Sequence, residues 1–130
     1  MPSLAQARAW YADADPIHGF DHVSRVLALA ERIGQAEGAD LEILRAAALL
    51  HDATAATPHD AAGRAAHHLA SADFAAEVLN AEGWPPERIA AVQHCIRAHR
   101  FRDNSEPPAT LEARILFDAD KLDVLGAVGA

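Results

Sequence analysis

Cysteine and long apolar runs are both scarce in this 130-residue chain. Its single cysteine, Cys95, excludes a disulfide within the chain, which is typical of proteins from a reducing compartment. The longest apolar stretch, Ala46 to Leu50, is far shorter than the roughly 20 residues that a membrane-spanning helix needs. Residues 1–12 contain no basic segment followed by an apolar run, the pattern of a secretory signal. We therefore predict a cytoplasmic protein with no membrane partner.

Positively charged residues are also scarce. The chain has 11 Lys and Arg against 19 Asp and Glu, a formal net charge of −8 at pH 7. Binding to nucleic acids or anionic membranes depends mainly on clustered Lys and Arg, so a nucleic-acid polymer is not an expected partner. One small phosphorylated ligand remains compatible with this charge, because a bound cation can offset the charge of the ligand.

Aromatic residues make up only 5% of the chain, and much of its 51% hydrophobic content is alanine. Strands favour β-branched and aromatic residues, whereas alanine is the strongest helix former. The length suits one compact domain with a sizeable core and little more. These features predict an all-α fold in a single domain that covers residues 1–130.

Start and stop signals for helices recur along the chain. Asp40 and Thr110 are suitable N-caps, Pro86 suits a first helical turn, and Gly38 and Gly83 are suitable stops. Six helices with short connections predict a compact irregular bundle. The predicted helices are Leu4–Ala12, His22–Glu37, Leu41–Asp52, Ala61–Glu82, Pro85–His99 and Leu111–Leu125.

Two His-Asp pairs occur, at His51-Asp52 and at His59-Asp60. The second follows a proline at the start of a predicted helix, where Asp60 is best interpreted as an N-cap. The first is different, because His51 extends the apolar face of its helix and Asp52 lies beside it. A carboxylate against a core is costly unless a cation or hydrogen-bond donors face it.

His22, His68 and Asp120 also lie on the apolar faces of their predicted helices. Taken alone, each histidine is more often a hydrogen-bonded core or surface residue, and Asp120 could pair with Lys121 or an arginine. A bundle that buries several uncompensated polar groups should not be stable, so we expect these side chains to converge. Mixed imidazole and carboxylate ligands suit Mn, Fe, Co, Ni or Mg better than a thiolate-rich zinc site.

Three segments together carry a recognisable signature. They read His18-Gly-Phe-Asp-His22-Val-Ser-Arg25-Val26, Ala-Ala-Leu-Leu-His51-Asp52 and Asp118-Ala-Asp120-Lys121-Leu-Asp123. In order and spacing the chain resembles the HD superfamily of metal-dependent phosphohydrolases, and in particular its small bacterial members. The resemblance implies one or two divalent metal ions per chain, held by His22, His51, Asp52 and Asp120.

Some members of this superfamily carry two further histidines that bind a second metal or the substrate phosphate. The similar positions here are His68 and His99. His67 is a rival to His68, because Ser71, Phe74 and Val78 form a second plausible inward face, but His68 fits the motif as well as a helical face. His99 lies on the inward face of its helix, whereas His94 points elsewhere. The resemblance therefore implies catalytic roles for Asp52, His68 and His99.

Arg25 and Lys121 lie close in sequence to predicted ligands. With His68 and His99 they are candidate contacts for a substrate phosphate, and the alternative for either cation is an ion pair with a nearby carboxylate. Asp118 and Asp123 flank Asp120 and point partly away from it, so we expect them to support the ligands or to lie at the surface.

The resemblance implies hydrolysis of a phosphoester or phosphoanhydride in a small nucleotide-like substrate, by a metal-activated water. The alternatives are a di-iron oxygenase on the same scaffold and a non-catalytic module that binds metal and nucleotide for regulation. Two departures from the family favour the module. Ala55 stands where some subgroups place a catalytic Lys or Glu, and the sequence ends at Ala130, soon after the last motif, which predicts a C-terminally shortened domain.

Overall fold

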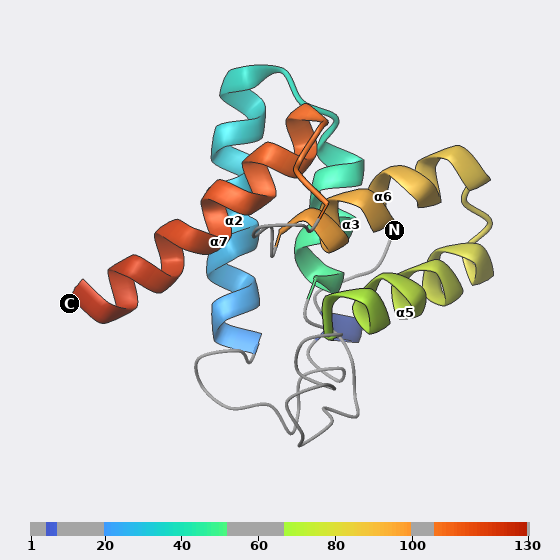
Figure 1. Cartoon of the computed structure of the whole chain (residues 1–130), viewed down its shortest axis with the longest axis horizontal. Coiled ribbons are helices and arrows are strands. Elements are labelled where there is room, and N and C mark those ends of the chain that lie inside the picture. Colours follow the sequence, from blue (N-terminus) through green and yellow to red (C-terminus); the bar gives the residue numbers. More distant parts are fainter. Residues whose placement is uncertain (1–4, 8–19, 52–66, 100–105, 130) are drawn as a thin grey trace.

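The computed structural model describes residues 5–7, 20–51, 67–99 and 106–129, without the side chains of 67–69 and 124–129. The described residues form helices and their connections, with no strand among them (Figure 1). The predicted all-α class is confirmed. After a short helical piece at 5–7, the helices are α2 (Phe20–Glu37), α3 (Leu41–Leu50), α5 (His67–Ala81), α6 (Pro86–Ala98) and α7 (Leu111–Gly129).

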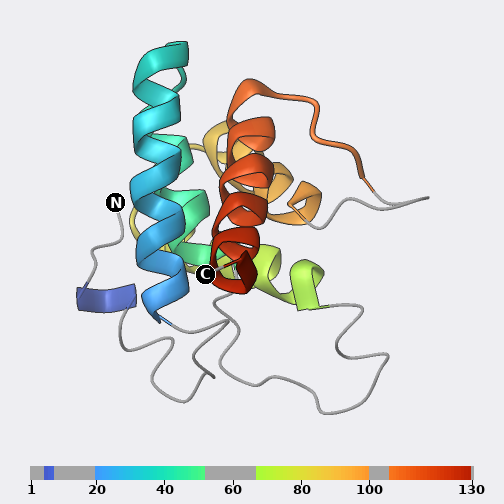
Figure 2. The same ribbon diagram turned by 90° about the vertical axis from the view of Figure 1, so that its left-hand side faces the viewer.

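Helix α3 lies at the centre of the bundle, where it packs against α2, α5, α6 and α7. Seven of its ten residues are buried, including the whole run from Ala46 to Leu50. A helix that is apolar on nearly every side is stable only when neighbours surround it. Helices α2 and α7 lie side by side on one flank of α3, and α5 packs against α6 on the other (Figures 1 and 2).

The helix ends follow the local signals. The Asp40 side chain accepts hydrogen bonds from the backbone N–H groups of Glu42 and Ile43, and Thr110 Oγ1 accepts from the Ala113 N–H at 3.1 Å. Both groups satisfy donors that have no partner within the helix. After α5, Gly83 has a φ of 82°, the left-handed conformation that commonly ends helices and that glycine adopts most easily.

Two predicted boundaries need correction. Helix α7 continues through Gly126 to Gly129, although we predicted an end at Leu125. A glycine inside a helix costs about 1 kcal/mol relative to alanine, which weakens a helix without ending it. Helix α3 ends at Leu50 with His51 as its C-cap, so it does not reach Asp52. Among the described helices, none is long and apolar enough to cross a membrane.

Candidate metal centre

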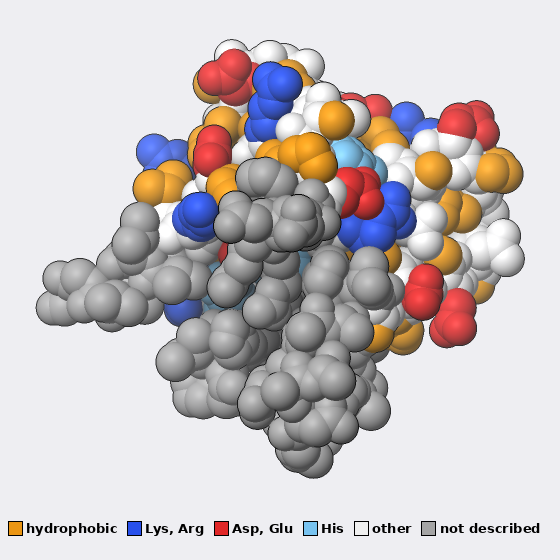
Figure 3. Space-filling model, in the orientation of Figure 1, with side chains coloured by type: hydrophobic (Ala, Val, Ile, Leu, Met, Phe, Trp, Pro, Cys, Tyr) orange, Lys and Arg blue, Asp and Glu red, His pale blue; other side chains and the backbone are white. Residues whose placement is uncertain are grey.

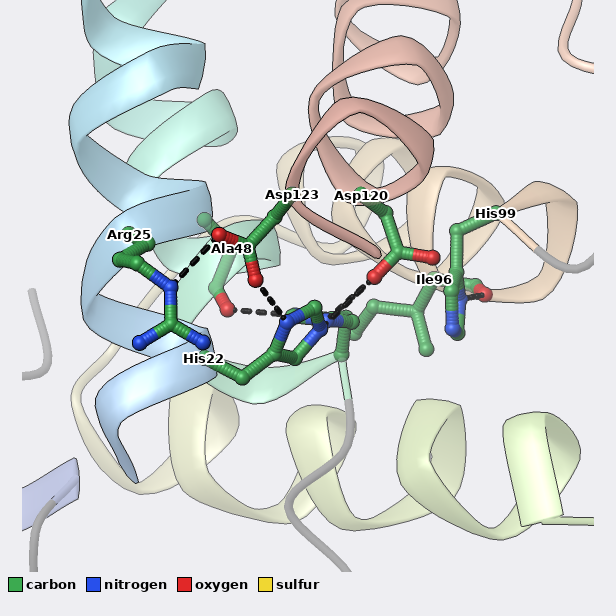
Figure 4. A network of polar contacts seen from close by, with 8 residues as sticks. His22, Arg25, Ala48, Ile96, His99, Asp120 and Asp123 are labelled. Atoms are coloured by element: carbon green, nitrogen blue, oxygen red, sulfur yellow. Dashed lines mark hydrogen bonds and ion pairs between the residues drawn. The ribbon is translucent and has the colours of Figure 1, made fainter. Parts of the chain in front are cut away.

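Helices α2, α3 and α7 bring three of the predicted ligands together. His22 is near the start of α2 and Asp120 lies in α7 (Figure 4). His51 caps the end of α3. One ligand atom from each lies within 4.8 Å of the other two. His22 Nε2 is 2.9 Å from Asp120 Oδ1, and His51 Nε2 is 3.4 Å from the same oxygen. Two imidazole nitrogens therefore face one carboxylate.

The rings of His51 and His99 are oriented by the backbone. His51 Nδ1–H donates to the Ala48 carbonyl at 2.7 Å, and His99 Nδ1–H donates to the Ile96 carbonyl. The two rings meet edge to face, with centroids 5.0 Å apart. When Nδ1 carries the hydrogen, the lone pair of a neutral imidazole is on Nε2, the nitrogen that His51 turns toward Asp120.

Charge in this cluster is set by burial and by the pairing of imidazole with carboxylate. Burial alone would raise the pKa of Asp120, but the hydrogen bond from His22 and the electrostatic effect of His51 outweigh it and lower the pKa below its usual range. Burial likewise opposes the charged form of His22, yet its contacts with Asp120 and Asp123 raise its pKa. The result is a largely buried carboxylate that stays ionised beside two imidazoles.

This donor set fits a divalent cation. Two nitrogens and one anionic oxygen are ligands that Mn, Fe, Co and Ni all accept, and the burial of both histidines strengthens the attraction of the site for a cation. The fourth predicted ligand, Asp52, lies outside the described residues.

Comparison with known proteins agrees with this arrangement. The family model described as "HD domain" matches residues 19–125, a range that contains His22, His51, Asp52 and Asp120. The chain belongs to the HD-domain family. The resemblance found in the motifs is thereby confirmed.

Solved relatives support the HD-domain assignment across nearly the whole chain. A predicted HD superfamily hydrolase from an uncultured Thermotogales bacterium superposes with a TM-score of 0.79 at 36% identity, over 97% of this chain and 68% of that one. The structure of Bacillus subtilis YpgQ in complex with ADP gives a TM-score of 0.68 at 33% identity, over 98% of this chain and 63% of that one.

In sequence, this HD-domain chain is 35% identical to the uncharacterized protein YpgQ of Bacillus subtilis, over 136 residues. The alignment covers 99% of this chain and 63% of YpgQ. The chain therefore spans less than two thirds of the length of this relative.

Several other predicted site residues of the HD domain can be placed. His99 is buried beside His51, as predicted, and His94 faces away, where it contacts Glu106 and accepts from the Ala109 N–H at 3.0 Å. Asp118 is exposed. The side chains of His67 and His68 lie outside the described residues, so the choice between them stays a prediction.

The two predicted cationic residues differ in their surroundings. Arg25 forms the ion pair that we considered as an alternative, with its Nε 2.6 Å from Asp123 Oδ1. Lys121 is exposed, and its Nζ lies 4.3 Å above the centre of the Phe117 ring. For both residues, contact with a substrate phosphate stays a prediction.

The sequence analysis did not identify Asp123 as a partner of His22. It is buried, and its Oδ2 accepts from His22 Nδ1–H at 2.7 Å, so it contacts a predicted ligand and does not lie at the surface. Leu116, Asp120 and Asp123 have the spacing i, i+4, i+7, which places all three on one helical face. This periodicity in the sequence could have identified Asp123 as an inward-facing residue.

Proposed function

We propose that this chain is a metal-dependent phosphohydrolase acting on a phosphoester or phosphoanhydride of a small nucleotide-like molecule. The observation that carries this proposal is the convergence of His22, His51 and Asp120, whose ligand atoms lie within 4.8 Å of one another inside an HD-domain fold. Asp52 directly follows His51 and completes the proposed ligand set, which falls entirely within the matched residues 19–125.

Each described residue has a distinct part in this proposal. His22 and His51 bind through Nε2, and Asp120 supplies a negative charge that its surroundings keep ionised. A divalent ion in this position supplies polarisation of a phosphoryl oxygen and a water of lowered pKa. His99 donates Nδ1–H to a backbone carbonyl, so its Nε2 can bind a second ion when the ring is neutral and can donate to a phosphate oxygen when the ring is protonated.

The remaining predicted roles belong to the same proposal. Asp52 and His68 act with His99 in catalysis, and Arg25 and Lys121 are cations within reach of a bound phosphate. Phosphoryl transfer requires little covalent help from the protein, so positioning and positive charge near the phosphoryl oxygens supply most of the rate.

Two observations support a small nucleotide-like substrate. YpgQ was crystallised in complex with ADP, and its structure matches 98% of this chain. The described part of the face in Figure 3 shows Lys and Arg interspersed with Asp and Glu, without a broad basic patch. Such a surface matches a small ligand better than a nucleic-acid polymer.

The test combines metal analysis with turnover. Purified chain is stripped with a chelator, titrated with Mn²⁺ or Mg²⁺ by calorimetry, and assayed for phosphate release from nucleoside mono-, di- and triphosphates. Cleavage of a chromogenic phosphodiester is followed in parallel. We expect metal binding and metal-dependent hydrolysis in the wild type and a large loss of both in Asp120→Asn. Asp118→Asn, an exposed aspartate of the same helix, should behave as wild type.

Three other outcomes would contradict the proposal. A wild-type chain that binds no divalent ion would remove its basis. Metal and ADP binding without turnover of any substrate would instead favour a non-catalytic regulatory module. Two redox-active irons per chain, with oxygen consumption, would favour an oxygenase.

A further inference from the structure

Two of the buried histidines obtain their orientation from the ends of their own helices. His51 caps α3 and His99 caps α6, and each ring donates Nδ1–H to the carbonyl three residues earlier, on Ala48 and Ile96. The last carbonyls of a helix have no N–H partner within the helix. These two rings satisfy such carbonyls and at the same time leave Nε2 for a ligand.

His22 cannot use this arrangement, because it lies at the N-terminal end of its helix, whereas His51 and His99 lie at C-terminal ends. It is the third residue of α2, which begins at Phe20, so the position three residues earlier precedes the helix. The first turn of a helix presents N–H donors that have no helical partner, not carbonyl acceptors. An acceptor for Nδ1–H therefore has to come from another part of the fold.

Asp123 of α7 supplies that acceptor. Its Oδ2 lies 2.7 Å from His22 Nδ1, across a separation of 101 residues in the sequence (Figure 4). The other oxygen, Oδ1, accepts from Arg25 Nε at 2.6 Å. His22 and Arg25 are three residues apart on α2, a spacing that places their side chains on neighbouring positions of the helix surface. One carboxylate thus bridges two consecutive turns of α2.

We infer that Asp123 is a positioning residue for His22, and that Arg25 holds Asp123 in place. A carboxylate oxygen only accepts hydrogen bonds, so Asp123 keeps the hydrogen on Nδ1 and leaves Nε2, which faces Asp120, to bind an ion. Arg25 thereby acts on His22 through Asp123. This inference rests on the proposed function, because positioning has a consequence only when His22 is a ligand.

The experiment compares Mn²⁺ affinity by calorimetry in the metal-free full chain and four variants. Asp123→Asn keeps the shape of the side chain and removes its charge, and its amide can present a donor to Nδ1. Removing a partner that orients a metal-binding histidine typically costs 10- to 100-fold in affinity. We expect a loss of about 10- to 100-fold in Asp123→Asn, and a smaller loss in the same direction in Arg25→Gln.

The chain offers a matched control for each variant. Asp118→Asn removes an exposed aspartate of α7. Arg45→Gln removes an arginine whose Nε contacts Glu31 at 2.8 Å and whose side chain is 41% exposed, compared with 49% for Arg25. We expect both controls to keep wild-type Mn²⁺ affinity. Circular dichroism and melting temperature establish that each variant is folded.

The outcomes separate this inference from the function on which it rests. If the wild type binds no Mn²⁺, the proposed function and the role of Asp123 both fail. If the wild type binds Mn²⁺ and folded Asp123→Asn binds it equally well, only the positioning role fails. Should Asp123→Asn not fold, Arg25→Gln decides. If Arg25→Gln keeps wild-type Mn²⁺ affinity but binds ADP more weakly at saturating Mn²⁺, Arg25 is a phosphate contact and its supporting role is wrong.

Discussion

Replacing Asp120 with asparagine keeps the shape of the side chain and removes its charge. In the metal-free protein, Asp120 Oδ1 lies 2.9 Å from His22 Nε2 and 3.4 Å from His51 Nε2. Only the shorter contact, from His22, is a hydrogen bond, and a hydrogen bond to a charged group contributes about 1.5–3 kcal/mol. Asp120 is only partly exposed, so solvent screens these contacts little. We expect Asp120→Asn to lower the free energy of unfolding of the metal-free chain by about 2 kcal/mol.

The same substitution should remove the stabilisation that metal binding provides. An ion that binds only the folded state at 100 times its dissociation constant adds about 2.7 kcal/mol of stability. For a chain of this size that corresponds to a rise of about 10 °C in melting temperature. We expect this rise in the wild type and in Asp118→Asn, and a rise of less than about 2 °C in Asp120→Asn.

Differential scanning fluorimetry with and without Mn²⁺ measures both effects in one experiment. The decisive quantity is the difference between the two melting temperatures for each variant, because it cancels any change in the stability of the metal-free fold. An equal Mn²⁺-dependent rise in wild type and Asp120→Asn would refute the reasoning that places Asp120 among the ligands.

Two further predictions concern groups away from the site. Hydrogen bonds from Arg88 lower the pKa of Asp40 despite partial burial, so its contribution to stability is present above the ordinary carboxyl pKa and is lost as the pH falls through the lowered value. Urea unfolding should therefore show a larger difference between wild type and Arg88→Gln at about pH 7 than at about pH 2, and an equal difference would contradict this contribution. Burial raises the pKa of the Cys95 thiol to about 12, so a thiol reagent should modify it only after unfolding, and rapid labelling of the native chain would contradict its burial.

Much of the local structure could be predicted from the sequence. The Asp40 and Thr110 caps, the stop at Gly83 and the inward faces of His22, His51 and Asp120 depend on residues within one or two helical turns. Such interactions repeat with the helical period, so a pattern in the sequence is enough to identify them. The signature of the family added the order of the ligands along the chain.

Only the tertiary structure decided which groups meet across helices. His22 and Asp123 are 101 residues apart, and Arg25 has Asp123 as its partner where the sequence allowed either an ion pair or a phosphate contact. Helical phase indicates which side of α7 faces inward, but the packing of α7 against α2 determines which residue of α7 lies opposite His22. For that reason the sequence by itself indicated the candidate ligands, whereas the carboxylate that contacts one of them was evident only from the packing of α2 against α7.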